Sequence, residues 1–365
     1  LKIGFDAKRA FNNSTGLGNY SRSVIDSISQ HNPTYQLNLF TPSKNHDIFK
    51  IQKPNTQIIT PNVGINKHYW RFTGINKDIN QLNIDIFHGL SNELPFGINT
   101  KSVVTIHDLL FLKYPQFYNL IDRKIYNFKS KYACKKADKI IAISQQTKED
   151  IVNYYNINPN KIEVIYQSCH KDFINSNTNT QIDSKLKSQL SKPYVLFVGG
   201  SEKRKNLFFL LKAIRKINNI RLICVGKNNQ KNSKIQSFIT QNNLQNKVTF
   251  LNIKSVKILA EIYKRSEGLV YPSIDEGFGI PIIEAMYCSV PVIISDKKIF
   301  KEIGGEHAYY FKQNKLESLI QQIKKIIVNS EERSVRIEKN LNYVKKFNKH
   351  NQAEQISDLY HNLKS

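Results

Sequence analysis

Short apolar segments alternate with longer helical segments along almost the whole chain of 365 residues. Most of the short segments are apolar throughout, as expected for strands that are buried on both faces. Repeated alternation of strand and helix favours parallel sheets with helices on both sides, an α/β fold. In the first half the predicted strands are 2–6, 36–41, 57–60, 84–88, 102–106, 139–143 and 162–166. In the second half they are 194–199, 220–226, 247–251, 268–272, 291–295 and 308–311.

The chain is long enough for two domains with separate cores. Residues 168–193 contain no predicted strand and are rich in Asn, Ser, Thr and Lys, which is typical of a domain boundary. We therefore predict a Rossmann-like N-terminal domain over residues 1–175 and a Rossmann-like C-terminal domain over residues 176–347.

The composition excludes some classes of protein and leaves others open. The 54 Lys and Arg residues exceed the 29 Asp and Glu residues, which gives a net charge of +25. Nucleic acid, an anionic membrane surface and phosphorylated substrates all fit this charge. The mean hydropathy is −0.44, and no apolar run approaches the ~18 residues that cross a membrane. The chain starts directly in a predicted strand without a secretory signal, so we expect a cytoplasmic protein.

The four cysteines are far apart and form no Cys-x-x-Cys pair. This spacing predicts free, buried thiols in a reducing compartment, and neither a disulfide framework nor a zinc site.

The strongest functional signal lies in residues 271–296, which read YPSIDEGFGIPIIEAMYCSVPVIISD. Gly277 and Gly279 allow the backbone to approach a ligand closely, and proline fits the first turn of the helix that follows. The start of a helix offers free N–H groups and a positive dipole end, which suit a phosphate. Glu276 and Glu284 lie on either side of this anion site and offer acceptors for sugar hydroxyls. The segment predicts a site for a phosphorylated sugar or a nucleotide.

This segment resembles the Glu-x7-Glu motif of retaining glycosyltransferase family 4. The spacing of Glu276 and Glu284, the Glu-Gly-Phe-Gly-Ile-Pro core, and the Glu-Ala-Met and Val-Pro-Val that follow all agree with the motif. The family has the GT-B fold, in which two Rossmann-like, doubly wound domains face each other across the cleft that holds the active site. The resemblance implies this fold here, with a C-terminal helix, over about 348–365, that crosses back to the first domain.

The resemblance also implies how a nucleotide-diphosphate sugar would bind, mainly to the C-terminal domain. It assigns the ribose hydroxyls of the donor to Glu284. It assigns the sugar and the diphosphate to Glu276 and to the backbone amides of Gly277, Phe278, Gly279 and Ile280.

A second segment, residues 198–206, reads VGGSEKRKN between a predicted strand and the apolar helical run 207–214. Gly199 permits a tight turn, and Arg204 and Lys205 place two cations beside it. Cations next to free amides can hold a diphosphate and neutralise it as it leaves. A solvated basic helix start has the same pattern. The matching Arg-Lys pair of family 4 contacts the diphosphate, so the resemblance gives this role to Arg204 and Lys205.

Two segments of the first domain also resemble the family. Residues 15–20, TGLGNY, precede a helical run over 21–28 and resemble its glycine loop, which implies that Gly16 and Gly18 face the donor diphosphate. An ordinary loop has the same pattern.

His107 follows the strand 102–106 in an Ile-His-Asp-Leu sequence, which is similar to family members that use mannose donors. In those proteins the histidine lies beside the transferred sugar and the acceptor. Asp108, His88 and Ser144 are further candidates at the ends of strands, with purely structural roles as the alternative.

Residues 122–139 contain seven cations and two acids, with Ile125, Phe128 and Tyr132 at helical spacing. Two interpretations stay open. Such a helix can lie on an anionic membrane surface, or it can pack by its apolar side and leave a solvated basic face.

We therefore expect a retaining, metal-independent hexosyltransferase without a cofactor. Its first-choice donor is GDP-mannose, and its acceptor is a glycan or a lipid-linked glycan of surface polysaccharide such as lipopolysaccharide. The expected catalytic residues are His107, Glu276, Arg204 and Lys205. No Asp-x-Asp metal motif is present, and the basic pair would take the place of the metal.

Two alternatives stay open. The first is other sugar-nucleotide chemistry on the same fold, such as epimerisation or phosphorolysis. The second is a basic protein that binds nucleic acid or a membrane, although no nucleic-acid motif appears and the basic residues are dispersed.

Overall fold

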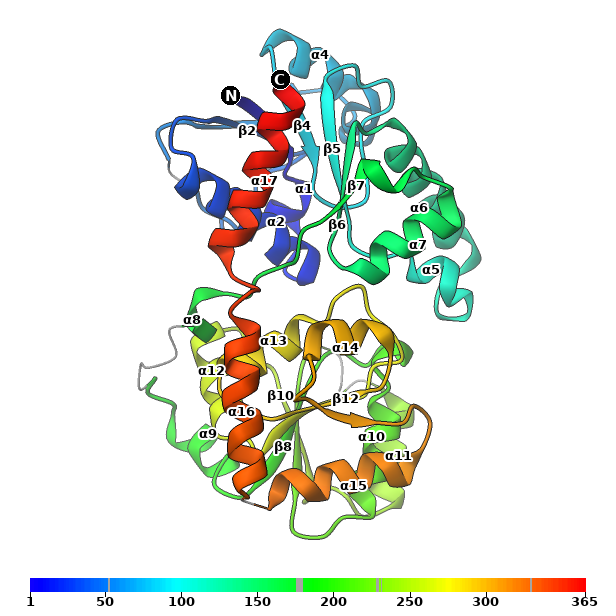
Figure 1. The fold of residues 1–365 in the computed structure, drawn as a ribbon, viewed down its shortest axis with the longest axis vertical. Coiled ribbons are helices and arrows are strands. Elements are labelled where there is room, and N and C mark those ends of the chain that lie inside the picture. The colour runs from blue at the N-terminus through cyan, green and yellow to red at the C-terminus, as the bar shows by residue number, and fades with distance from the viewer. Residues whose placement is uncertain (52, 175–179, 228–229, 231, 329) are drawn as a thin grey trace. The chain divides into compact units, whose positions relative to one another are not determined.

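The computed structural model describes residues 1–51, 53–174, 180–227, 230, 232–328 and 330–365 (Figure 1). The chain forms two compact units. The N-terminal unit comprises Leu1–Ser168 and Phe347–Ser365, and the C-terminal unit comprises Cys169–Lys346. The boundary expected from the sequence, between 175 and 176, lies outside the described residues. Among the described residues, no helix has the length and apolar character needed to span a membrane.

The N-terminal unit contains a seven-stranded parallel sheet in the order β3-β2-β1-β4-β5-β6-β7. Its strands are β1 (Lys2–Asp6), β2 (Gln36–Phe40), β3 (Thr56–Ile59), β4 (Ile86–Gly89), β5 (Lys101–Ile106), β6 (Lys139–Ala142) and β7 (Ile162–Val164). Its helices are α1 (Lys8–Asn12), α2 (Gly16–His31), α3 (Lys67–Tyr69), the π-helix η1 (Trp70–Gly74), α4 (Ile75–Gln81), α5 (Leu110–Lys113), η2 (Pro115–Phe117), α6 (Leu120–Lys136), α7 (Gln145–Tyr155), η3 (Pro159–Lys161) and α17 (Lys349–Lys364).

The C-terminal unit contains a six-stranded parallel sheet in the order β10-β9-β8-β11-β12-β13. Its strands are β8 (Tyr194–Val198), β9 (Arg221–Val225), β10 (Val248–Leu251), β11 (Gly268–Tyr271), β12 (Val292–Ser295) and β13 (Tyr309–Phe311). Its helices are α8 (Lys171–Ile174), α9 (Ser184–Gln189), η4 (Lys203–Lys205), α10 (Leu207–Arg215), α11 (Ser233–Gln241), α12 (Val256–Lys264), α13 (Ile280–Tyr287), α14 (Lys298–Gly304), α15 (Leu316–Ile327) and α16 (Glu331–Val344).

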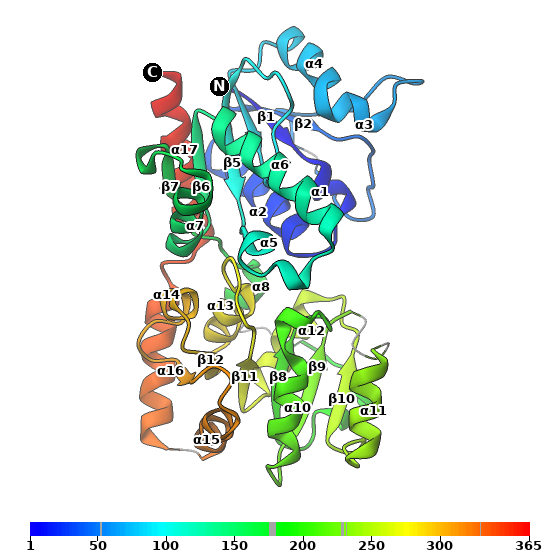
Figure 2. The same cartoon turned by 90° about the vertical axis from the view of Figure 1, so that its right-hand side faces the viewer.

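The predicted fold class is confirmed, because both sheets are parallel and doubly wound (Figures 1 and 2). Every predicted strand is present, and its ends differ from the prediction by at most two residues. The strand order reverses between β1 and β4 in one unit and between β8 and β11 in the other. Open α/β sheets bind ligands at the carboxyl ends of the strands at such a reversal.

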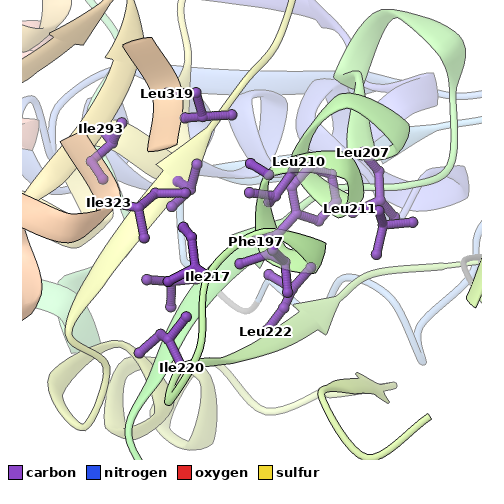
Figure 3. Close-up of a cluster of buried hydrophobic side chains, with 14 of the residues drawn as sticks. Phe197, Leu207, Leu210, Leu211, Ile217, Ile220, Leu222, Ile293, Leu319 and Ile323 are labelled. Carbon is purple, nitrogen blue, oxygen red and sulfur yellow. The ribbon is translucent and has the colours of Figure 1, made fainter. Parts of the chain in front are cut away.

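Apolar side chains fill the space between the C-terminal sheet and its helices (Figure 3). Phe197 of β8 and Ile293 of β12 contribute from the sheet. Leu210 of α10 and Leu319 and Ile323 of α15 contribute from the helices, and all five side chains are inaccessible to solvent. Truncating a side chain of this kind to alanine costs about 2–5 kcal/mol of stability. This core fixes α10, and the basic segment that carries Arg204 and Lys205 directly precedes it.

The predicted start of the helix at residue 21 is wrong, because α2 begins at Gly16 and takes in most of the expected glycine loop. Thr15 is extended, and Gly16 and Gly18 both lie in the first turn of the helix. A β-carbon added to Gly18 would lie 1.8 Å from the carbonyl oxygen of Asn13. Gly18 is therefore needed where the helix start packs against the preceding backbone, a tertiary contact that outweighs the low helix propensity of glycine.

The C-terminal helix α17 packs against α2 in the N-terminal unit (Figure 1). Its Tyr360 hydroxyl lies 2.6 Å from Nδ1 of His88 in β4, and the imidazole Nε2 lies 2.8 Å from the hydroxyl of Thr105 in β5. Burial, together with the charge of His107, lowers the pKa of His88 to about 3, so the ring is neutral at physiological pH. Nδ1 of His88 thus holds α17 on the sheet while Nε2 bonds within the sheet, which gives this histidine a structural role.

Replacing Tyr360 with phenylalanine is expected to lower the stability of the N-terminal unit by about 1–3 kcal/mol, because it leaves a buried imidazole nitrogen without its partner. Urea denaturation followed by circular dichroism measures the change. Tyr69→Phe is the control, since the Tyr69 side chain is 65% exposed. Equal midpoints for the two variants would contradict the proposed role of Tyr360.

Candidate functional site

Two loops of the C-terminal unit meet because the strands before them are neighbours. β8 and β11 pair side by side at the point where the strand order reverses. The segment after β8 carries Arg204 and Lys205 on η4, and the segment after β11 carries Glu276. A backbone hydrogen bond of 2.9 Å from Ile274 N to the Arg204 carbonyl oxygen joins the two segments.

Glu276 pairs with both cations. Its Oε1 lies 2.7 Å from Lys205 Nζ, and its Oε2 pairs with the Arg204 guanidinium. Arg204 also donates to the carbonyl oxygen of Asp275 at 3.0 Å. The three side chains are only 10–20% exposed, so these charges are largely withdrawn from water. Two cations thus lie against the Glu276 carboxylate, and positive groups held in this way suit an anionic ligand.

The charges in this cluster keep one another ionised. Burial alone would raise the pKa of Glu276, but the charges of Lys205 and Arg204 outweigh it and lower the pKa to about 2. Burial would likewise lower the pKa of Lys205, but the Glu276 carboxylate outweighs it and raises this pKa. At neutral pH the lysine is therefore a fixed ammonium ion and the glutamate a fixed carboxylate.

Tyr271, at the end of β11, completes the cluster and was not among the predicted site residues. Lys205 Nζ donates to its hydroxyl at 2.8 Å and lies 5.1 Å from the centre of its ring. Burial, with the charge of Glu276, raises the pKa of Tyr271 to about 12, so the hydroxyl stays neutral. In the sequence this tyrosine ends an apolar run, and nothing separates it from an ordinary core residue.

The segment after Glu276 leads into α13 as predicted, with Pro281 in the first turn. Gly279 caps this helix at φ +110°, in the left-handed region where only glycine is unstrained, and an added β-carbon would lie 2.9 Å from Ile282 Cδ1. The Phe278 side chain is 3% exposed and belongs to the core. Of the predicted donor contacts in Gly277, Phe278, Gly279 and Ile280, Phe278 can therefore contribute only through its backbone.

Glu284 lies in α13, where its Oε2 accepts a hydrogen bond of 2.9 Å from the Tyr263 hydroxyl of α12. Burial of the carboxyl group raises its pKa to about 7, and the Tyr263 hydrogen bond opposes this shift. Glu276 and Glu284 thus differ in charge near neutral pH, because only Glu276 has cations beside it. Two carboxyl groups with separated pKa values are typical of sites where each has its own role.

The segment between β8 and α10 borders an open cavity of about 540 Å³. Lys203, Asn206 and Phe208 line it on one side, and residues of α11 line the other. Gly199, a predicted site residue, precedes this segment, and its N–H donates to the Val225 carbonyl oxygen at 2.9 Å. Lys203 of the basic segment therefore borders the cavity, whereas Arg204, Lys205 and Glu276 do not line it.

In the N-terminal unit, His107 lies directly after β5. Its Nε2 is 2.9 Å from the Leu90 carbonyl oxygen, so Nε2 carries the proton and Nδ1 is an acceptor. Burial lowers the pKa of His107 to about 4, which keeps the ring neutral at physiological pH. The amide of His107 donates to the Asn92 side chain at 2.9 Å, and Asn92 was not predicted from the sequence. A neutral imidazole with a fixed acceptor suits hydrogen bonding to a hydroxyl.

Two of the further candidates have local structural contacts. Asp108 accepts a hydrogen bond from Leu110 N at 3.1 Å, at the start of α5. Ser144 caps α7, where its Oγ accepts from Thr147 N at 3.0 Å. Among the described residues, no group of three or more His, Cys, Asp or Glu side chains is arranged to hold a metal ion.

Comparison with known protein families identifies both halves of the chain. Residues 16–169 match the model described as Glycosyltransferase Family 4, and residues 178–343 match the model described as Glycosyl transferases group 1. Both models agree with the resemblance carried by residues 271–296.

Among curated proteins, the chain is 32% identical to the O-antigen chain mannosyltransferase RfbU of Salmonella typhimurium over 71% of this chain and 69% of that protein. It is 26% identical to O-antigen chain mannosyltransferase B of Escherichia coli over 75% of this chain and 74% of that protein. Among solved structures, the sucrose-phosphate synthase of Thermosynechococcus elongatus superposes with a TM-score of 0.78 at 20% identity, over 99% of this chain and 98% of that one.

The geometry around Glu284 predicts its titration. A ¹³C NMR titration of the glutamate carboxyl groups, with the Glu284→Gln variant to assign the signal, should give a midpoint near 7. Tyr263→Phe should move this midpoint upward, because it removes the hydrogen bond that favours the carboxylate. A midpoint at the ordinary glutamate value would mean that the carboxyl group is solvated and the burial is wrong.

Proposed function

The chain belongs to the glycosyltransferases of family 4 and group 1, and on this premise we propose that it transfers mannose from GDP-mannose to a glycan or lipid-linked acceptor. The transfer retains the anomeric configuration and needs neither a metal ion nor a cofactor. The observation that carries the proposal is the ion-paired cluster of Arg204, Lys205 and Glu276, which lies where the strand order of the C-terminal sheet reverses.

The C-terminal unit provides the donor contacts. Arg204 and Lys205 bind the diphosphate, and their positive charges offset part of its negative charge. The amides at the start of α13 contact the same diphosphate. The Glu284 carboxylate accepts hydrogen bonds from the ribose hydroxyls, and Glu276, kept ionised by its cations, accepts hydrogen bonds from the sugar.

The same contacts explain how the reaction is accelerated. The acceptor hydroxyl attacks the anomeric carbon on the face from which the diphosphate leaves, so the new bond keeps the configuration of the old one. The bond from the anomeric carbon to the phosphate oxygen breaks, and a leaving phosphate oxygen takes the acceptor's proton. Negative charge grows on the diphosphate during this step, and the preformed cations Arg204 and Lys205 stabilise it. His107 offers its Nδ1 to a sugar hydroxyl.

Mannose is proposed for two reasons. His107 lies in an Ile-His-Asp-Leu sequence similar to that of mannose-using family members, and the two curated relatives are named as O-antigen chain mannosyltransferases. Surface polysaccharide such as O-antigen is accordingly the proposed destination of the sugar.

The proposal is tested with GDP-mannose, UDP-glucose, UDP-N-acetylglucosamine and UDP-galactose, assayed for binding and slow hydrolysis in EDTA. GDP-mannose should bind most tightly, and its hydrolysis should survive EDTA. Lys205→Ala should lower turnover by at least about tenfold, because a charge-assisted contact to the diphosphate contributes roughly 1.5–3 kcal/mol.

Lys216→Ala is the matched control, because this exposed lysine pairs only with Glu317 in the described contacts. Unchanged turnover in Lys205→Ala, or activity abolished by EDTA, would contradict the proposal. Tighter binding of a UDP-sugar would overturn the choice of donor and leave the role of the cations intact.

Donor affinity should also depend on pH through Glu284. The carboxylate form of Glu284 accepts hydrogen bonds from ribose hydroxyls better than the protonated form does. Because the pKa of Glu284 is near 7, most of its ionisation occurs between pH 6 and pH 8. Affinity for GDP should therefore rise with pH and be about tenfold weaker at pH 6 than at pH 8. Isothermal titration calorimetry measures this, and Glu284→Gln should flatten the profile. A wild-type profile as flat as that of the variant would exclude Glu284 from the donor site.

A further inference from the structure

The helix α6 turns its large apolar side chains outward. The residues that it buries are small: Ser130, Ala133 and Cys134. The side chains of Ile121, Ile125 and Phe128 are 72%, 44% and 63% exposed. The interpretation in which this helix packs by the side that carries Ile125 and Phe128 is therefore wrong, because its small residues make the packing contact instead.

Four apolar residues lie along one line of the helix, and three of them are among its exposed residues. Ile121, Ile125, Phe128 and Tyr132 are spaced by four, three and four residues, which places them on the same face. Tyr132 ends the line, where its hydroxyl accepts a hydrogen bond of 2.8 Å from Gly97 N and anchors the helix to the unit. In Figure 2, α6 lies on the near side of the N-terminal unit.

Cations border this apolar line on both sides. Lys124, Lys131 and Lys135 are exposed along one edge, and Lys136 is exposed on the other. Asp122 is the one acid of the helix, and it is engaged by the side chain of Asn119. The outward face of α6 is thus apolar along its centre and positive at its edges.

A row of half-buried aromatic rings lies beside the apolar line of α6. Phe128 lies 5.6 Å from Phe96, and Phe96 lies 5.7 Å from Phe72 of η1, measured between ring centres. Phe128 therefore rests against aromatic rings of the N-terminal unit at one side and is open to solvent at the other.

We propose that the outward face of α6 binds the surface of an anionic phospholipid bilayer, with Ile121, Ile125 and Phe128 inserted among the acyl chains and the flanking lysines on the phosphate groups. Lysine suits the edge of such a contact, because its long stem stays apolar while its ammonium group reaches the headgroups. The charge pattern favours lipid over nucleic acid, which would need cations along the centre of the face and not only at its edges. The same pattern favours lipid over a protein partner. The face carries cations but no acid, so it could form ion pairs only with anionic groups.

The inference does not rest on the proposed donor chemistry, since no residue of the donor cluster belongs to α6. If the acceptor is lipid-linked, as proposed above, the contact would keep the enzyme at the surface where this acceptor is found.

Sedimentation of the full chain with vesicles tests the proposal. The chain should bind vesicles of phosphatidylcholine with added phosphatidylglycerol, and bind vesicles of phosphatidylcholine alone much more weakly. Binding should decrease with salt, because headgroup attraction is screened within about a Debye length.

Two sets of substitutions separate the two parts of the face. The variant Ile121→Ser with Phe128→Ser removes apolar contact at constant charge and should weaken binding by at least about tenfold. The variant Lys124→Gln, Lys131→Gln and Lys135→Gln removes three charges and should weaken it by about a hundredfold. The control for the serine variant is Val335→Ser, at an exposed position of α16. The control for the glutamine variant combines Lys324→Gln, Lys325→Gln and Lys339→Gln, all at exposed helical positions of the C-terminal unit.

Three results would overturn the proposal. Control substitutions that weaken binding as much as those in α6 would assign the effect to net charge. Unchanged binding by the serine variant would exclude insertion of the apolar line. Binding of duplex DNA or RNA through the same lysines, without binding to vesicles, would assign the face to nucleic acid. The circular dichroism spectrum and the thermal midpoint of each variant check folding, and both should equal those of the unmodified chain. This check does not depend on the identity of the donor, so a failure here is separate from a failure of the donor assignment.

Discussion

The pairing of Glu276 with Arg204 and Lys205 is the interaction on which the candidate site depends. The three charged groups are largely withdrawn from water, where an unpaired charge is costly, so each one requires the others. Because the cations follow β8 and the carboxylate follows β11, the pairing joins two loops and fixes both before a ligand arrives. A cation pair that is already in place needs no rearrangement when negative charge develops on a leaving group, which is the physical advantage of such a site.

Most of the fold could be predicted because its strands are buried on both faces, so they are apolar throughout and stand out from the helices. The start of α2 could not be predicted in this way, because glycines favour a loop. Gly18 lies in the helix because it packs closely against the Asn13 carbonyl, and this contact is not visible in the sequence. The orientation of α6 was equally hidden. Its sequence contains an apolar stripe, but only the tertiary structure reveals that the small residues Ser130 and Ala133 face the sheet and leave Phe128 outside.

The site was predicted where the sequence holds a spaced motif, and missed where a residue acts through packing. His88 and His107 both lie at strand ends and look alike in sequence. The difference arises because Tyr360, far along the chain, uses one nitrogen of His88, while His107 keeps an acceptor available. Tyr271 and Tyr263 could not be predicted as site residues for a related reason. Each lies in an apolar strand or helix, where the sequence predicts a core tyrosine. Only the structure shows that one hydroxyl contacts a lysine and the other a glutamate.

A crystal structure of the enzyme with its nucleotide-sugar donor tests the account most directly. Diphosphate oxygens should lie within hydrogen-bonding distance of Lys205 Nζ and the Arg204 guanidinium, and the ribose hydroxyls should bond to the Glu284 carboxylate. A diphosphate held by a metal ion or by other residues, with the pairing of Glu276 to Lys205 and Arg204 left untouched and remote from the ligand, would contradict it.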